Sequence, residues 1–455
     1  MTAVSDSLIF REMFSTPEVA QIWADQRRTE YYLQFEAKLA SVQARLGIIP
    51  KEAEQVIQSV CRFEYIDMER YASDTKQIGY PVLPLVKQLV KLANERDVSN
   101  QNLGEWVHWG ATTQDVTDTA TVLQLRDTCS VVSETLKGII VALRGLCQKH
   151  ASTPMAARSN LQQAVPITFG FKLARLLSTF QRHQQRLEEV LRRLLVVEFG
   201  GASGTLATLA DTGLAMEVQE GLAKELGLGV PEIAWHTERD RIVEIGALFA
   251  MLAGTCAKFA LDIKLLMQTE VGEVFEPYAA HRGSSSTMPQ KRNPISSVYI
   301  TALAATVKQL SAALFDSLVE DHERSTGPWE IEWIVLPQIS TMTHAALVHT
   351  QALLEGLEVY PDAMRKNLNL TRGGIVSEAV MMALGKVMGR QKAHDLVYDL
   401  CIRLAKTPDK TLLDLLVENP SIKECGLDRE ALERLCDPEN YLGLSKKMVE
   451  RVLNV

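Results

Sequence analysis

Long stretches of apolar residues at helical spacing are the feature that most constrains the fold of this chain. Residues 118–150 carry such a stripe over many turns and contain no proline. Residues 168–197, 241–269 and 294–319 show the same period, and few segments alternate as a strand would. The sequence therefore predicts an all-α protein built on several long helices that lie side by side.

One of these helices is apolar on almost every side. Between residues 245 and 263, Lys258 and Asp262 are the only charged residues. A helix of this kind is buried on all faces in a soluble protein, and its polar ends argue against a membrane span. We expect a bundle whose core continues into neighbouring copies of the chain, and a homotetramer rather than a dimer.

Glycine and proline clusters divide the chain. They lie at 47–50, 79–84 and 200–204, and the helical segments become shorter after 369–374. We predict three helical domains: an N-terminal domain at 1–110, a central long-helix bundle at 111–360, and a small C-terminal domain at 361–455.

Composition limits the partners and the compartment. The formal net charge of −8 and the lack of a dense Lys/Arg cluster argue against a nucleic-acid partner. The first ten residues lack the layout of a signal peptide, and we expect no apolar run to be long enough to cross a bilayer. Seven scattered cysteines without a Cys-x-x-Cys pair suit a reducing compartment. We expect a cytoplasmic protein with no membrane partner.

The most informative segment for function is 283–294, Gly-Ser-Ser-Ser-Thr-Met-Pro-Gln-Lys-Arg-Asn-Pro. Small hydroxyls and backbone N–H groups, followed by the cation of Lys291, suit a carboxylate that gains negative charge during a reaction. The alternative is a polar surface loop, which is the usual fate of Gly/Ser/Pro stretches.

Two further polar segments interrupt the helices. In 108–115, His108 can shuttle a proton while Thr and Gln side chains bind carboxylate oxygens. In 158–166, Arg158 precedes an amide-rich run that fits an anion held by a guanidinium fork. The alternatives are a helix N-cap formed by Thr113, Asp115 or Thr117 for the first segment, and side chains that face water for the second.

A fourth stretch, 322–326, contains Arg324, which could clamp a second carboxylate, and Trp329 and Trp333 follow as possible walls of a pocket. A solvated helix end is the competing interpretation. The sequence has no His-Glu-x-x-His, no phosphate-binding Gly-x-x-x-x-Gly-Lys-Ser/Thr and no Gly-x-Ser-x-Gly. His236 has charged neighbours but no ligand partner in sequence, so we predict a structural hydrogen bond for it, with no metal and no cofactor in the protein.

Together these segments resemble the fumarase/aspartase superfamily, whose loop usually reads Gly-Ser-Ser-x-Met-Pro-x-Lys-x-Asn-Pro. Ser285 and Ser286 fall on the two serines, and Ser284 stands where the family has glycine. The resemblance covers nearly the whole chain. It points to the branch of adenylosuccinate lyase and 3-carboxy-cis,cis-muconate cycloisomerase, and residues 79–86, 108–115, 161–164 and 322–327 are more similar to the cycloisomerase.

The resemblance implies a homotetrameric lyase of the long-helix bundle type, with each active site shared between three subunits. Ser285 is then expected to remove a proton from the carbon next to a carboxylate, and Lys291 and Asn293 to bind the resulting aci-carboxylate. His108 is the third catalytic candidate. The residues expected to contact a di- or tricarboxylate substrate are Thr112, Thr113, Gln114, Arg158, Ser159, Asn160, Gln162, Ser286, Met288, Asn293, Arg324 and Ser325.

One departure from the family bears on the substrate. Adenylosuccinate lyases have an Arg-Thr-His triplet whose His protonates the departing nitrogen, and the triplet here is Arg158-Ser159-Asn160. An amide cannot act as a general acid, so Asn160 favours a carboxylate or another stable anion as the leaving group, unless His108 supplies the proton.

The leading hypothesis is a cofactor-free lyase that performs β-elimination, or the reverse addition, on a succinate-type polycarboxylate to give a fumarate-like product. One alternative is the intramolecular lactonisation catalysed by 3-carboxy-cis,cis-muconate cycloisomerase. The other is a non-catalytic role like that of lens crystallins, against which the intact Ser285, Lys291 and Asn293 argue.

Overall fold

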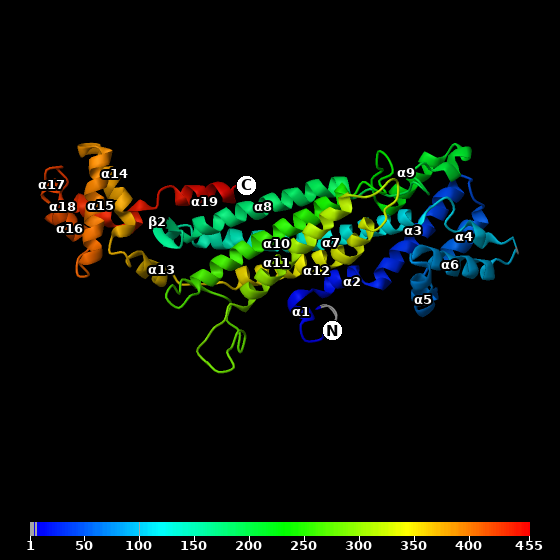
Figure 1. The fold of residues 1–455 in the computed structure, drawn as a ribbon, viewed down its shortest axis with the longest axis horizontal. Helices are drawn as coiled ribbons and strands as arrows, with labels where there is room; N and C mark the ends of the chain where they lie inside the picture. Colours follow the sequence, from blue (N-terminus) through cyan, green and yellow to red (C-terminus); the bar gives the residue numbers. More distant parts are fainter. Residues whose placement is uncertain (1–3, 5–6, 100) are drawn as a thin grey trace. The chain divides into compact units, whose positions relative to one another are not determined.

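The computed structural model describes residue 4 and residues 7–99 and 101–455 (Figure 1). Most of these residues are helical, which confirms the predicted all-α fold. The five longest bundle helices are α7 (Thr113–Lys149), α8 (Phe169–Leu194), α10 (Asp240–Leu266), α11 (Ile295–Leu314) and α12 (Pro328–Glu355).

The chain divides into two compact units, and the division passes through all five of these helices. Unit 1 comprises residues 1–135, 183–254 and 302–348, and unit 2 comprises 136–182, 255–301 and 349–455. This partition differs from the three predicted domains, whose boundaries stay a prediction.

Besides its bundle segments, unit 1 contains a set of further helices and 3₁₀ turns. Its helices are α1 (Arg11–Phe14), α2 (Pro17–Ile22), α3 (Asp25–Arg45), α4 (Lys51–Val60), α5 (Met68–Ile78), α6 (Val82–Arg96) and α9 (Ala215–Leu226), with 3₁₀ turns η2 (Phe63–Tyr65), η3 (Leu103–Trp106), η4 (Ala207–Thr212) and η5 (Phe315–Leu318). Phe35, Leu39 and Leu222 lie in the shared core of α3 and α9. The predicted breaks at 47–50 and 79–84 separate α3 from α4 and α5 from α6.

The bundle segments of unit 1 pack closely at small residues. The backbone carbonyl of Gly246 in α10 accepts a hydrogen bond from Ser311 Oγ of α11 at 3.2 Å, and a Cβ on Gly246 would collide with Leu314. Gln184 of α8 donates to Ser133 Oγ of α7 at 3.1 Å. These contacts explain why a glycine is tolerated inside an otherwise regular helix, since it allows two helices to approach.

Unit 2 carries the strands and the C-terminal helices. Strand β1 (Pro154–Ser159) pairs antiparallel with β2 (Gln162–Thr168), and β3 (Val274–Phe275) pairs with β4 (Glu358–Val359). The helical elements are α13 (Pro361–Leu368), η6 (Gly374–Val376), α14 (Ser377–Met388), α15 (Arg390–Lys406), α16 (Leu412–Glu418), α17 (Pro420–Lys423), α18 (Arg429–Cys436), η7 (Pro438–Tyr441) and α19 (Ser445–Leu453). Helices α14, α15 and α16 share a core that includes Val380, Leu400 and Leu415.

Among the described residues, two helices, α10 and the stretch Ile295–Leu318, are long and apolar enough by length and composition alone to cross a membrane. The sequence-based expectation that no apolar run reaches this length is therefore too strict. The core helix of a soluble protein meets the same criterion, and more than half of the apolar stretch of α10 is buried inside the protein.

Candidate active site

The predicted site residues fall into two sets, and each set lies within one unit. Unit 1 holds His108, Thr112, Thr113, Gln114, Arg324 and Ser325, and unit 2 holds Arg158, Ser159, Asn160, Gln162, Ser285, Ser286, Met288, Lys291 and Asn293. The proposed base Ser285 and its proposed oxyanion partners Lys291 and Asn293 lie on one loop of unit 2, and their catalytic roles stay predictions.

Hydrogen bonds between Asn293 and Gly283 join the two ends of the loop 283–294. Both the backbone N–H and the side-chain Nδ2 of Asn293 donate to the carbonyl of Gly283, at 3.1 and 2.8 Å. Gly283 has a φ of +69°, and a Cβ there would lie 2.6 Å from the carbonyl oxygen of Asn293, so only glycine fits. Arg292 anchors the exit through two hydrogen bonds to the Glu358 carboxylate, at 3.1 and 3.2 Å.

Ser285 lies where two backbone N–H groups converge on its hydroxyl. Its Oγ accepts hydrogen bonds from the N–H of Met288 at 3.1 Å and of Thr287 at 3.3 Å. Donors aimed at an oxygen stabilise its anionic form more than its neutral form. The turn that follows Ser285 therefore supplies part of the positive field that a serine base requires.

Ser285 and Lys291 line one cavity of about 440 Å³ in unit 2. Within the described residues, the Lys291 ammonium has no hydrogen-bond or ion-pair partner, so its charge is available to a ligand. The buried Glu276 carboxylate also borders the cavity, but it accepts from the N–H groups of Ser296 and Ser297 at the start of α11. The sequence interpretation missed His281, which lines the same cavity and has a left-handed φ of +65°.

Arg158 does not offer a free fork in this structure. Its Nη2 and Nη1 donate to Oε1 and Oε2 of Glu273 at 2.7 and 3.0 Å, and the Glu273 side chain is fully buried. Asn367 Nδ2 donates to the same Oε1 at 2.8 Å. This ion pair supports a structural role for Arg158, and its predicted contact with substrate stays a prediction.

Ser159, Asn160 and Gln162 lie at the exposed tip of the β1–β2 hairpin. Asn160 and Leu161 form its two-residue turn with φ values of +50° and +64°. A turn of this type usually carries Asn-Gly, so Leu161 in place of glycine explains why the sequence did not reveal the hairpin. Like Ser286 and Met288, which are exposed on the loop 283–294, these side chains are accessible to a ligand.

In unit 1, His108 pairs with a buried carboxylate. Its Nδ1 lies 2.6 Å from Oε1 of Glu36, whose side chain is 2% exposed. Burial lowers the pKa of His108, but the charge and the hydrogen bond of Glu36 outweigh that effect and raise the pKa above its ordinary value. The raised pKa extends the pH range over which His108 is protonated, the form in which it can donate a proton or bind an anion.

The start of α7 and Arg324 form one hydrogen-bonded group. Arg324 donates from Nη1 to Oε1 of Gln114 at 2.6 Å, from Nη2 to the carbonyl of Gly201 at 2.8 Å, and from Nε to the carbonyl of Ala202 at 3.1 Å. A guanidinium has five N–H donors, so one on each Nη is left for a carboxylate. Thr112 and Thr113 are half-buried at the same helix N-terminus, where free N–H groups favour anions.

The tryptophans after Arg324 belong partly to the scaffold. Ser325 Oγ accepts the N–H of Trp329 in the first turn of α12. The Trp329 indole is buried and donates to Oδ1 of Asp118 at 3.0 Å, and the ring of Tyr80 stacks on it with centroids 6.3 Å apart. The role of Trp329 and Trp333 as pocket walls stays a prediction.

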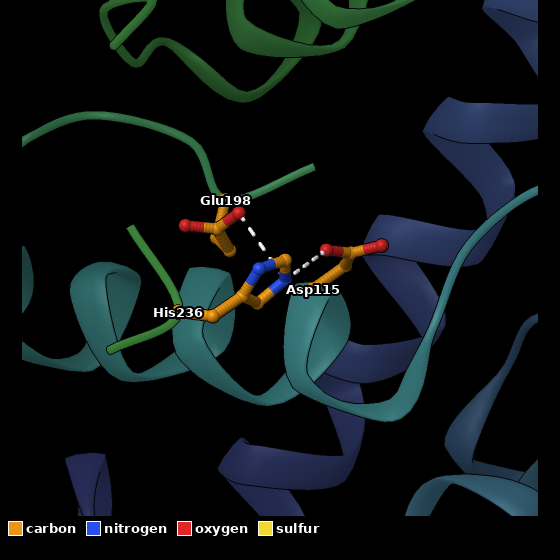
Figure 2. Close-up of side chains that lie close together, drawn as sticks. All are labelled: Asp115, Glu198 and His236. Atoms are coloured by element: carbon orange, nitrogen blue, oxygen red, sulfur yellow. Dashed lines mark hydrogen bonds and ion pairs between the residues drawn. The ribbon is translucent and has the colours of Figure 1, made fainter. Parts of the chain in front are cut away.

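His236 lies between two buried carboxylates that the sequence did not bring together (Figure 2). Its Nε2 is 2.9 Å from Oδ1 of Asp115 and 3.3 Å from Oε1 of Glu198. One ligand atom from each residue lies within 4.8 Å of the others, a spacing that could hold a metal ion. Both oxygens of Asp115 also accept backbone N–H groups, from Gly200 and from Gly201, whereas Glu198 Oε1 has no hydrogen-bond partner among the described residues. The predicted structural hydrogen bond of His236 is present.

The chain is similar in sequence and structure to several known lyases and cycloisomerases. A sequence family described as "Lyase" matches residues 11–308, and one described as "Adenylosuccinate lyase C-terminus" matches residues 373–452. The chain is 56% identical to trans-aconitate decarboxylase 1 of Mycosarcoma maydis, over 97% of this chain and 88% of that protein. It is 42% identical to 3-carboxy-cis,cis-muconate cycloisomerase of Pseudomonas aeruginosa, over 100% and 97%. The solved 3-carboxy-cis,cis-muconate lactonizing enzyme of Pseudomonas putida superposes with a TM-score of 0.91 at 40% identity, covering 98% of each chain.

Proposed function

The chain belongs to the fumarase/aspartase superfamily of lyases, and on that premise we propose that it decarboxylates an unsaturated tricarboxylate of the trans-aconitate type through carbanion chemistry at Ser285. The observation that carries this proposal is the pair of backbone N–H groups that converge on Ser285 Oγ. A hydroxyl held in this way can give up its proton and recover it within one turnover.

The superfamily reaction uses Ser285 as a base. Its alkoxide removes the proton from the carbon next to a carboxylate, and the electron pair moves into that carboxylate to form an aci-carboxylate dianion. Lys291 supplies the opposing charge from the same cavity. Asn293 keeps one Nδ2 hydrogen for the ligand, because the other is bonded to Gly283. A group on the neighbouring carbon then leaves with its bonding electrons, and a double bond forms.

Decarboxylation also passes through an aci-carboxylate, but here Ser285 donates a proton to carbon instead of removing one. The bond between the methylene carbon and its carboxylate breaks, and CO₂ leaves without that electron pair. The pair shifts through the double bond into the carboxylate at the far end, which becomes an aci-carboxylate. The Ser285 hydroxyl donates a proton to the carbon beside it, giving a methylenesuccinate, and recovers a proton from water. One CO₂ is released and one proton is consumed.

The nature of the leaving group favours decarboxylation over elimination of a basic group. Asn160 cannot protonate a departing atom, and CO₂ needs no proton to depart. The 56% identity to a trans-aconitate decarboxylase supports the same choice. The 42% identity to a cycloisomerase supports the second candidate, lactonisation of 3-carboxy-cis,cis-muconate, in which the reacting group is a carboxylate oxygen.

The test is a substrate panel with the purified full-length protein. We expect trans-aconitate to release CO₂, and the release to vanish in Ser285→Ala but persist in Ser284→Ala, which alters the neighbouring hydroxyl. Loss of the diene absorbance of 3-carboxy-cis,cis-muconate, with no CO₂ from trans-aconitate, would favour the cycloisomerase. Reaction of neither compound would redirect the search to fumarate with a series of nucleophiles.

We also propose that the protein is a homotetramer whose subunits share active sites. Large apolar side chains are exposed on three bundle helices of the single chain, namely Val141, Met251, Leu261 and Ile334. Such exposure on the longest helices is typical of surfaces that other copies cover. Light scattering of the purified protein tests the assembly, and a monomeric mass would contradict it.

A further inference from the structure

The Asp115–His236–Glu198 cluster connects to Arg324 through hydrogen bonds to the two backbone groups of Gly201. Asp115 accepts the N–H groups of Gly200 and Gly201 at 3.0 and 3.1 Å, which fixes the turn between α8 and α9. The carbonyl of Gly201 is one of the acceptors of Arg324. The cluster therefore sets where one of the three contacts of the guanidinium lies.

A second path leads through Gln114. The carbonyl of His236 accepts from Gln114 Nε2 at 2.7 Å, and Gln114 presents its Oε1 to Arg324. The same Nε2 donates to Asp118 Oδ2 at 3.1 Å. Since an amide has one donor end and one acceptor end, the contacts with His236 and Asp118 orient the acceptor end toward the guanidinium. Asp115 Oδ2 also accepts the N–H of Thr112 at 2.9 Å, which fixes the residue before α7.

Two glycines beside the cluster, Gly200 and Gly201, allow the close packing around His236. A Cβ on Gly200 would lie 3.0 Å from Cε1 of His236 and 2.8 Å from Cβ of Ala234, so glycine is needed for the imidazole to approach. Gly201 has a φ of +71°, which a side chain would strain. The Gly-Gly pair thus serves the close contact between the turn and His236.

Charges around the cluster are arranged to keep it in place. Glu198 Oε2 accepts the N–H of Trp235 at 2.7 Å. Burial, with the nearby charge of Asp115, raises the pKa of Glu198 to about 9, so this carboxyl carries a proton at neutral pH. Arg239 donates two hydrogen bonds to the Asp118 carboxylate, at 2.7 and 3.0 Å, and also donates to the Glu332 carboxylate. Asp115 Oδ1 is the nearer of the two carboxyl oxygens to His236 Nε2, at 2.9 Å against 3.3 Å for Glu198 Oε1.

We propose that Asp115, His236 and Glu198 are positioning residues that hold Arg324 and Gln114 in the geometry that binds a carboxylate of the substrate. This inference rests on the proposed function, because it takes Arg324 to be a carboxylate contact. The cluster touches no substrate; it acts through the Gly200–Gly201 turn and through the carbonyl of His236. Its effect falls on the affinity for the carboxylate and not on the proton transfer at Ser285.

The experiment is a double-mutant cycle on binding, with tricarballylate as a saturated tricarboxylate probe in calorimetry. His236→Gln keeps a neutral donor near the Nε2 position, and Arg324→Met removes the guanidinium. We expect each single variant to weaken tricarballylate binding by roughly tenfold, the loss of one charge-assisted contact. The double variant should bind within about twofold of Arg324→Met, because the positioning no longer matters once the guanidinium is gone.

His344→Gln is the matched control. His344 is also a buried histidine of unit 1 with two hydrogen bonds, to Thr16 and Thr135, and neither partner belongs to the cluster. It should lower the unfolding temperature and leave the affinity for tricarballylate unchanged. If His236→Gln does not fold, Glu198→Gln, which keeps the shape of the side chain, takes its place in the cycle.

The outcomes separate the two claims. Losses that multiply to roughly a hundredfold in the double variant would overturn the positioning role, as would normal binding in His236→Gln beside weak binding in Arg324→Met. Normal binding in Arg324→Met would overturn the carboxylate assignment of Arg324 and this inference with it. Decarboxylation at saturating substrate should stay within about twofold of wild type in His236→Gln, since Ser285 and Lys291 are unchanged.

Discussion

The Nδ1 atom of His108 lies 2.6 Å from Oε1 of Glu36, and the raised pKa of His108 follows from that contact. A histidine whose pKa is higher in the folded than in the unfolded state stabilises the fold most below the unfolded pKa, about 6.5. That stabilisation is lost as pH rises through the folded pKa. The pair therefore favours a fold that is more stable in mildly acidic than in alkaline solution.

We predict that Glu36→Gln lowers the pKa of His108 and removes this part of the pH dependence. Burial then acts without an opposing carboxylate, so the imidazole becomes neutral at a lower pH. NMR titration of His108 and denaturant unfolding at pH 6 and pH 9 measure both effects. Glu30→Gln, at a half-buried ion pair with Arg27, is the control. An unchanged titration of His108 in Glu36→Gln would contradict the assignment.

Replacing Arg158 should cost stability more than a surface ion pair does. Arg158→Met leaves the fully buried Glu273 carboxylate with only the Asn367 amide, and an unpaired buried charge destabilises by about 3 kcal/mol. Arg193→Met, which breaks an exposed pair with Glu244, should cost under about 1 kcal/mol. Urea unfolding of the two variants gives the comparison. Equal small losses would mean that Arg158 is free to serve the substrate, as the sequence suggested.

The sequence was sufficient for four of the long helices and for the loop 283–294, but not for every element or for the partners of each side chain. The helices α7, α8, α10 and α11 were predictable because apolar residues recur along each of them at helical spacing. Helix α12 was not predicted, and Pro337 within it is a residue that usually ends a helix. The loop 283–294 was recognisable because its chemistry lies in consecutive residues.

Contacts between distant segments leave no such local signal. His236 and Asp115 are 121 residues apart, and Arg158 and Glu273 are 115 apart. Nothing in the residues around His236 indicates that two carboxylates will face it, and nothing around Arg158 indicates that its fork is already paired. For this reason the sequence revealed neither the pairing of Arg158 with Glu273 nor the cluster beside Arg324, and the predicted contact of Arg158 with substrate stays a prediction.

Lys291→Met should lower kcat on the proposed substrate by about 10²–10³-fold, the usual cost of removing one strong oxyanion partner. The aci-carboxylate carries more negative charge than the bound substrate, so the loss in kcat should exceed the change in KM. Steady-state kinetics of Lys291→Met beside Lys308→Met, an exposed lysine on α11, provide the test. A change confined to KM would assign Lys291 to ground-state binding only.

Asn160→His restores the residue type that adenylosuccinate lyases have at this position, and we predict that it does not accelerate the native reaction. Histidine tolerates the left-handed φ of +50° at the hairpin tip, so the turn is kept. If CO₂ is the group that departs, a proton donor has nothing to protonate, and the rate stays within about threefold of wild type. A basic leaving group would instead gain about 10²-fold from the new acid. Asn160→Gly, which preserves the turn without a donor, separates the chemistry from the backbone. An increase found in Asn160→His and absent in Asn160→Gly would show that leaving-group protonation limits this enzyme, and it would return the choice of substrate to compounds that expel an amine or an alkoxide.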